Sequence, residues 1–165
     1  MQSYPVKNRH KTQPFVVGGC IIKKADKYLL VQEAKKDRGQ WNQPAGWMDL
    51  GENLVEGAKR EAEEETGLKI KVIGLLGIYS IIKPDDNEYG IKHAVKFIFA
   101  TEPLSEEIKV DQNEILQAKW FTLSEIKSMK KELRDIDIIA EVESYEQGKI
   151  FPIQLAENFC YQLDN

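Results

Sequence analysis

The chain has 165 residues, of which 42% are hydrophobic and 30% charged, and its formal net charge is −4 at pH 7. This length suits one globular domain with a sizeable core and leaves little room for two. The acidic balance argues against a nucleic-acid polymer as the main partner. The polar N-terminus lacks the apolar segment of a signal peptide, and no apolar run reaches the length of a membrane span. We therefore expect a cytoplasmic protein with no membrane partner.

The two cysteines, Cys20 and Cys160, lie far apart in the sequence, and neither belongs to a CxxC motif. Isolated cysteines of this kind are typical of reduced thiols in a cytosolic protein, with a single disulfide as the alternative.

The first part of the chain predicts an arm followed by two strands. Residues 1–13 are polar and end at Pro14, which indicates a flexible arm ahead of a single domain over residues 14–165. The apolar and β-branched runs over residues 15–23 and 28–33 predict strands joined by a hairpin-like turn.

A charged loop follows over residues 34–40. Lys35 and Arg38 in this loop are candidate ligands for substrate phosphates, although such a cluster more often solvates a turn. Pro44 argues against a central paired strand because proline cannot donate a hydrogen bond to a ladder. Gly46 permits a tight turn that exposes a backbone carbonyl.

A helix is predicted between Asn53 and Gly67. Asn53 is a favoured N-cap residue, and Glu56 three residues later completes the pattern of a capping box. Gly67 is typical of the left-handed residue that ends a helix. The small and apolar residues of this segment fall on one inward stripe: Leu54, Val55, Ala58 and Ala62.

Three acids of this helix, Glu61, Glu64 and Glu65, have the i, i+3, i+4 spacing that places side chains on one face. Like charges at this spacing repel and raise one another's proton affinity, which indicates a cationic partner. Carboxylate oxygens suit Mg²⁺ or Mn²⁺, whose remaining positions are commonly taken by water and substrate phosphates. The alternative is a solvated acidic face on a surface helix.

The rest of the chain predicts strands followed by two helices. Thr122 and Glu125 form a capping box that opens a short helix. Periodicity and turn residues predict the other elements: a strand over 69–82 with bends at Gly74 and Gly77, a turn over 83–90, a strand over 93–100, an acidic loop over 101–113, a strand over 117–122, and a helix over 136–147 ended by Gly148. This order predicts one α/β or α+β domain.

The spacing around the acidic helix resembles a known motif. The fixed positions of the Nudix box are matched by Gly46, by Glu52 after five intervening residues, and by the run REAEEETGL after seven more. The resemblance to the Nudix (MutT-like) hydrolases implies an α/β fold, namely an α/β/α sandwich with a mixed central sheet, in which the box forms a loop–helix–loop. Many relatives have Gly-Gly where this chain has Ala45-Gly46, so the backbone approach at Ala45 departs from the pattern.

Nudix hydrolases cleave a nucleoside diphosphate linked to another moiety with Mg²⁺ or Mn²⁺, so the resemblance implies this cofactor and a small nucleotide or diphosphate substrate. The implied metal ligands, matched by position, are Glu61, Glu64, Glu65 and the Gly46 carbonyl. The implied catalytic residues are Glu64, Arg60 and Glu61. Arg60 orients a carboxylate such as Glu52 or Glu61, and the base is Glu64 or another acid.

Further candidates lie outside the box. Glu114 is an additional acid, because several relatives place a metal-binding or basic carboxylate in the corresponding loop. An ordinary loop carboxylate is the alternative. Tyr79, Tyr89 and His93 are candidates for lining the substrate pocket, although aromatic residues beside strands more often pack in the core.

The flanking segments narrow the resemblance. The chain is similar to the NudJ-type phosphatases over residues 15–159. The segments that carry this similarity include WNQPAG, LVEGAKREAEEETG and IAEVESYEQGKIFPI. Those enzymes release orthophosphate from nucleoside tri- and diphosphates and act on thiamine-pathway diphosphates. The alternatives are a pyrophosphatase of ADP-ribose or nucleoside diphosphate sugars, which Pro84 favours, a MutT-like nucleoside triphosphate pyrophosphohydrolase, and a non-catalytic nucleotide-binding module. Many relatives dimerise, so a homodimer is a further expectation.

Overall fold

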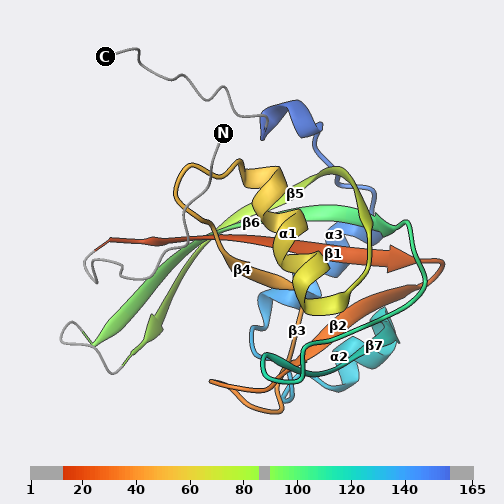
Figure 1. Ribbon diagram of the computed structural model, residues 1–165, viewed down its shortest axis with the longest axis horizontal. Coiled ribbons are helices and arrows are strands. Elements are labelled where there is room, and N and C mark those ends of the chain that lie inside the picture. Colours follow the sequence, from red (N-terminus) through yellow and green to blue (C-terminus); the bar gives the residue numbers. More distant parts are fainter. Residues whose placement is uncertain (1–12, 86–89, 157–165) are drawn as a thin grey trace.

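The computed structural model describes residues 13–85 and 90–156. Tyr89, Cys160 and all but the last residue of the predicted arm lie outside these residues. Within them, seven strands form one sheet (Figure 1), namely β1 (Phe15–Lys24), β2 (Lys27–Glu33), β3 (Trp41–Asn42), β4 (Ala45–Trp47), β5 (Ile70–Pro84), β6 (Ile91–Pro103) and β7 (Ile115–Thr122). The helices are α1 (Leu54–Thr66), α2 (Leu123–Ser128), α3 (Asp137–Glu146) and a short 3₁₀ turn, η1 (Ile153–Leu155).

The sheet is mixed. Its main path runs β3-β2-β1-β6-β5, and β4 pairs with β1 while β7 pairs with β2. β1 and β6 are parallel, and the other pairings are antiparallel. The two-residue β3 and three-residue β4 lie on either side of Pro44, whose carbonyl accepts a hydrogen bond from Cys20 N–H at 2.9 Å. Pro44 thus lies in the break between β3 and β4, as predicted, although its carbonyl still pairs with β1.

Both faces of the sheet are covered by helices. Side chains alternate between faces along a strand, so Ile22 packs in the cluster that contains Ala62 of α1, whereas Ile21 packs in the cluster that contains Ile138 of α3. In Figure 1, α1 crosses the front of the sheet and α3 lies behind it. This arrangement confirms the α/β/α sandwich with a mixed central sheet.

The long strand β5 contains the two predicted bends. The register between β5 and β6 shifts between Val72 and Gly74 and again between Leu75 and Gly77. The strand predicted over 93–100 is longer than expected, because Thr101 to Pro103 continue to pair with β5 and Thr101 is fully buried. The loop predicted to begin at Thr101 therefore begins after Pro103, where β6 ends.

Cys20 is a buried free thiol whose Sγ donates a hydrogen bond to the Ala58 carbonyl at 3.4 Å. Burial raises the pKa of this thiol, which keeps it protonated. None of the helices in the described part of the chain has the length and apolar character needed to cross a bilayer.

A carboxylate is buried between α3 and β6. Glu141 is 0% exposed, and Lys96 Nζ donates hydrogen bonds to Glu141 Oε1 at 3.3 Å and to Asp137 Oδ2 at 3.0 Å. Glu141 Oε2 has no hydrogen-bond partner among the described residues. Burial raises the pKa of Glu141 to about 7, against the opposing charge of Lys96. The ionised form of Glu141 is thus disfavoured in the folded protein.

We expect the Glu141→Gln variant to lose a pH dependence of stability. Between the unfolded pKa of 4.5 and the folded pKa of about 7, the folded state holds a proton that the unfolded state has lost. Wild-type stability therefore falls as pH rises through this window, by at most about 3 kcal/mol from this group. Urea denaturation at pH 5 and pH 8 gives the free energy of unfolding of both proteins. The difference in this free energy between variant and wild type should change from one pH to the other. Glu143→Gln on the same helix should track the wild type, and a pH-independent difference for Glu141→Gln contradicts the prediction.

Candidate active site

Helix α1 is fixed at both ends and packed closely on the sheet. Asn53 Oδ1 accepts hydrogen bonds from the N–H groups of Val55 at 2.9 Å and Glu56 at 3.5 Å, and Gly67 ends the helix with φ 72°. The predicted return bond from Glu56 to the cap is not formed, so the capping box is wrong although the N-cap is confirmed. A Cβ at Gly18 would lie 3.0 Å from Ala58 Cα, so glycine lets α1 approach β1.

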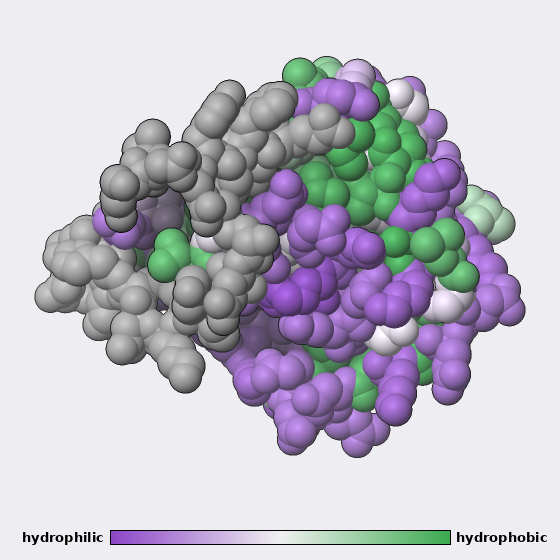
Figure 2. Space-filling view, turned by 45° about the horizontal axis from the view of Figure 1, so that its top comes forward, coloured by the Kyte–Doolittle hydropathy of each residue, from purple (hydrophilic) through white to green (hydrophobic). Residues whose placement is uncertain are grey.

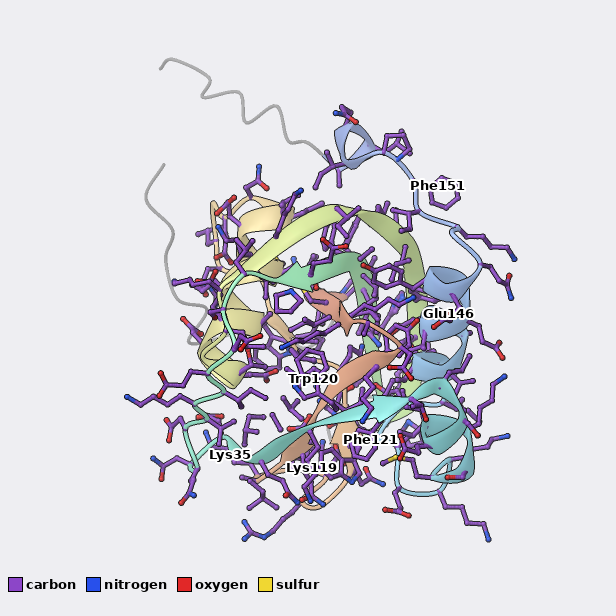
Figure 3. The ribbon with its side chains drawn as sticks, turned by 90° about the vertical axis from the view of Figure 1, so that its right-hand side faces the viewer. Lys35, Lys119, Trp120, Phe121, Glu146 and Phe151 are labelled. Carbon is purple, nitrogen blue, oxygen red and sulfur yellow. The ribbon has the colours of Figure 1, made fainter. Side chains whose placement is uncertain are left out.

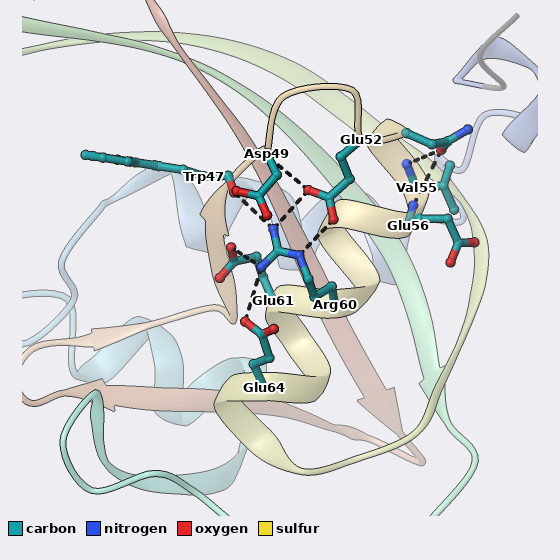
Figure 4. Close-up of polar contacts among 9 residues, drawn as sticks. Trp47, Asp49, Glu52, Val55, Glu56, Arg60, Glu61 and Glu64 are labelled. Carbon is teal, nitrogen blue, oxygen red and sulfur yellow. Dashed lines mark hydrogen bonds and ion pairs between the residues drawn. The ribbon is translucent and has the colours of Figure 1, made fainter. Parts of the chain in front are cut away.

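Arg60 joins the acids of the box (Figure 4). Its Nε and Nη2 donate to the two carboxylate oxygens of Glu52 at 2.7 and 2.9 Å, and Nη1 donates to Glu61 at 2.7 Å and Glu64 at 3.1 Å. Nη2 also donates to the Trp47 carbonyl at 3.2 Å. The bidentate contact with Glu52 is the geometry for which a guanidinium is suited. Sequence reasoning offered Glu52 or Glu61 as the partner of Arg60, and the structure shows both contacts.

The Arg60 contacts set the ionisation of Glu52. Burial opposes the shift, but hydrogen bonds from Arg60 and from the Asp49 N–H, together with the charge of Arg60, lower the pKa of Glu52. Hydrogen bonds to Glu52 and Glu61, and the charges of these two carboxylates, raise the pKa of Arg60. Glu52 is therefore a structural anion that anchors Arg60 beside Glu61 and Glu64.

Glu61 and Glu65 lie against β4. The Glu61 carboxylate is so close to Gly46 that a Cβ there would be 2.0 Å from Glu61 Oε2, and Glu65 Oε2 accepts a hydrogen bond from the Ala45 N–H at 3.0 Å. Burial raises the pKa of Glu65 well above its usual value, and the charges of Glu33 and Glu61 add to this shift. Burial also raises the pKa of Glu61, against the opposing effect of Arg60. Two half-buried acids whose ionised forms are disfavoured indicate a place suited to a cation.

Glu64 is more exposed than Glu61 and Glu65. Its side chain is 61% exposed and borders a surface hollow with Glu63 and Lys69, on the hydrophilic face that carries α1 (Figure 2). The described residues include no set of three His, Cys, Asp or Glu side chains already arranged around a metal position. Instead, Glu61 and Glu64 converge on the Arg60 guanidinium.

The donor set nevertheless fits a hard divalent cation. Glu61 and Glu65 supply carboxylate oxygen atoms at this edge, which Mg²⁺ and Mn²⁺ prefer as ligands. A side chain at position 46 would force the Glu61 carboxylate to move from its present place. Glu64 would join this set by exchanging its contact with Arg60.

The other candidate residues lie elsewhere. Lys35 ion-pairs with Glu114, and both side chains are exposed, with Lys35 beside the start of β7 in Figure 3. Arg38 Nη1 donates to the Ala34 carbonyl at 2.7 Å. None of these three side chains contacts the box acids.

The aromatic and histidine candidates are also separate from the box. Tyr79 packs against the core beside α3, and burial raises its pKa to about 12. His93 Nε2 is 2.8 Å from Ser80 Oγ. The structure thus gives both residues local partners, and Tyr89 lies outside the described residues.

Several residues near the box were missed by sequence reasoning. They line a pocket that also includes the three residues of β4, Ala45, Gly46 and Trp47. The missed residues are Gln43, Lys83, Lys92, Lys96 and Arg134. The alternation of Lys92, Ala94 and Lys96 along one strand face is a signal that could have found part of this set. Arg134 precedes α3 and carries no such local signal.

The fold and the acid-lined edge define a family. A model of the NUDIX domain matches residues 12–142, so the chain belongs to the NUDIX family. The protein is accordingly a hydrolase of phosphoanhydride bonds.

Individual relatives refine this assignment. Phosphatase NudJ of Escherichia coli is 29% identical over 150 residues, which cover 89% of this chain and 93% of that protein. A NUDIX hydrolase from Nitrosomonas europaea superposes with a TM-score of 0.78 and 31% identity over 89% of this chain and 98% of the other. An ADP-ribose pyrophosphatase from Streptococcus suis shares the fold, with a TM-score of 0.56 and 22% identity over 79% of this chain and 92% of the other.

Replacing Arg60 with methionine should destabilise the protein. The change leaves Glu52 and Glu61, whose side chains are 8% and 16% exposed, without their cation. Removing one partner of a buried ion pair costs about 3–5 kcal/mol, and the partial exposure of Arg60 should reduce this loss. Urea denaturation without divalent metal measures this loss. Arg60→Lys keeps the charge without the fork and should fall between methionine and wild type, whereas an unchanged midpoint for Arg60→Met contradicts the structural role.

Proposed function

We propose that the protein is a Mg²⁺-dependent phosphatase of the NudJ type, which releases orthophosphate from nucleoside tri- and diphosphates or related small diphosphates. The observation that carries the proposal is the β4 edge, where Glu61 lies against Gly46 and Glu65 binds the Ala45 N–H. The similarity to phosphatase NudJ over 150 residues supports the substrate class.

The box residues have distinct roles in this proposal. Glu61, Glu65 and the Gly46 carbonyl would hold Mg²⁺ or Mn²⁺, with Glu64 as a further ligand or as the base. When bound, the cation neutralises phosphate oxygens and lowers the pKa of a coordinated water. Arg60 holds Glu61 in position through its anchor on Glu52. Glu64 is the exposed acid of the set, and its carboxylate is accessible to take a proton from the attacking water.

The experiment that tests the proposal is a product panel. Purified protein is incubated with Mg²⁺ and, separately, with a nucleoside triphosphate, a nucleoside diphosphate, a thiamine-pathway diphosphate and ADP-ribose. Orthophosphate as the product, abolished by chelation of Mg²⁺, is the expected result. Pyrophosphate from the triphosphate would favour the MutT-like alternative, and AMP with ribose phosphate would favour the ADP-ribose pyrophosphatase.

Binding without turnover would contradict the enzymatic proposal. Stoichiometric nucleotide binding in the presence of Mg²⁺, with no product from any compound, is the result expected of a non-catalytic module. The box retains every acid of its motif, so we expect turnover. Analytical ultracentrifugation of the same preparation tests the expected homodimer.

A further inference from the structure

A small pocket lies on the side of β4 away from the box acids and contains a group of cations. Four cationic side chains line it, and we call it the cation pocket: Lys83 of β5, Lys92 and Lys96 of β6, and Arg134 before α3. It also shares Ala45, Gly46 and Trp47 with the acid-lined edge. The cation pocket and the acid-lined edge therefore adjoin one another along β4.

The strand register forces like charges together. Lys83 and Lys92 are directly opposite one another on the antiparallel strands β5 and β6. Like charges in this position destabilise a sheet. Burial, reinforced by the charge of Arg134, lowers the pKa values of both lysines. The charged forms of Lys83 and Lys92 are therefore disfavoured, and a bound anion would relieve this.

The carboxylates around the pocket hold some cations and leave others available. Arg134 is held by Glu33 at 2.9 Å and Asp37 at 3.0 Å, and these contacts use its Nη1 and Nε atoms. Lys83 contacts Asp135. Lys92 makes no ion pair with a carboxylate in residues 13–85 and 90–156, and its Nζ lies 5.0 Å from the Phe15 ring and 5.2 Å from the Trp47 ring. Lys92 is the cation best placed to take an external anion.

A buried amide in the pocket wall also lacks a partner. Gln43 is 0% exposed, and neither its Nε2 nor its Oε1 has a hydrogen-bond partner among the described residues. Buried polar groups are normally paired, and an unpaired one destabilises the fold. Its Nε2 is a donor that a phosphate oxygen would satisfy.

The volume of the pocket limits the ligand. It encloses about 120 Å³, whereas pockets for drug-sized ligands occupy about 300–1,000 Å³. A nucleoside exceeds this space, but a compact anion such as a phosphate group does not. Size, charge and the unpaired amide thus indicate the same kind of ligand.

We propose that the cation pocket binds the terminal phosphate of the substrate, with Lys92, Gln43 and the Nη2 group of Arg134 as its ligands. This inference rests on the phosphatase function proposed above and specifies its substrate class. The enzyme prefers compounds that end in a free phosphate, which carries up to two negative charges. Compounds in which that phosphate is esterified by a sugar carry one charge less there and a group too large for the pocket.

The first test measures phosphate binding without catalysis. Inorganic phosphate is titrated calorimetrically into protein in EDTA, which removes the contribution of divalent metal. We expect one phosphate per chain and a dissociation constant at least about tenfold larger for Lys92→Met, because a charge-assisted hydrogen bond is lost. The matched control is Lys71→Met, an exposed lysine near the other end of β5, which should bind as the wild type does. Absence of binding, or binding unaffected by Lys92→Met, overturns the proposal.

The second test separates this proposal from the proposed function. Steady-state kinetics with Mg²⁺ compare UDP with UDP-glucose. Lys92→Met should raise KM for UDP about tenfold more than for UDP-glucose, with kcat changed less. Metal-dependent hydrolysis with equal effects on both compounds overturns the pocket assignment alone. Phosphate binding that depends on Lys92 in a protein without hydrolytic activity would support the pocket and overturn the phosphatase function.

Discussion

Glu64→Gln is expected to lower kcat by about 10²–10⁴-fold, the range for loss of a general base. The folded structure should persist, because the Glu64 side chain is 61% exposed and accepts a 3.1 Å hydrogen bond from the partly exposed Arg60. Rapid measurement of product release at saturating Mg²⁺ gives kcat, and thermal unfolding shows that the fold is retained.

Glu56→Gln is the matched control for this prediction. Glu56 is exposed on the first turn of the same helix and contacts none of the box acids. Its substitution changes the same charge on α1 and should leave kcat within about twofold of the wild type. Equal losses for Glu64→Gln and Glu56→Gln would indicate a general effect of helix charge, and wild-type activity of Glu64→Gln would remove Glu64 from the catalytic set.

Gly46→Ala is expected to abolish most of the activity through Glu61. The added Cβ would lie 2.0 Å from Glu61 Oε2, so the carboxylate must leave the β4 edge. Displacement of a catalytic group by about 1 Å can cost about 100-fold in rate, and we expect at least this loss together with a higher Mg²⁺ requirement. Activity is measured across a Mg²⁺ titration.

Ala45→Gly is the control for the glycine position. It removes a methyl group from the neighbouring residue of β4 and leaves the N–H that binds Glu65. Activity and Mg²⁺ requirement should stay near the wild type. Full activity of Gly46→Ala at the wild-type Mg²⁺ concentration would show that the contact between Glu61 and Gly46 is dispensable.

The acidic helix could be predicted because its signals are local. Asn53 and Gly67 mark its ends, and the i, i+3, i+4 spacing places Glu61, Glu64 and Glu65 on one face. The contact of Arg60 with Glu52 or Glu61 is expected from the resemblance to the Nudix box. The greater exposure of Glu64 relative to Glu61 could not be predicted in this way. It depends on how α1 packs on the sheet, where Gly18 of β1 lets the helix approach closely at Ala58.

The cation pocket is invisible to local reasoning for a related cause. Lys83 and Lys92 face one another because of the register between β5 and β6, and Arg134 reaches them from the segment before α3. The sequence around Gln43 shows only that Pro44 follows it. Its burial without a hydrogen-bond partner among the described residues is a property of the folded chain. Non-local pairing and burial therefore decide this part of the site.

A crystal of the protein grown with Mn²⁺ and measured at the manganese absorption edge tests the central claim most directly. We predict an anomalous peak at the edge of β4, within coordination distance of Glu61, Glu65 and the Gly46 carbonyl, and its loss in Glu61→Gln. Manganese bound elsewhere, or the same peak in Glu61→Gln, would contradict the assignment of this edge as the metal site.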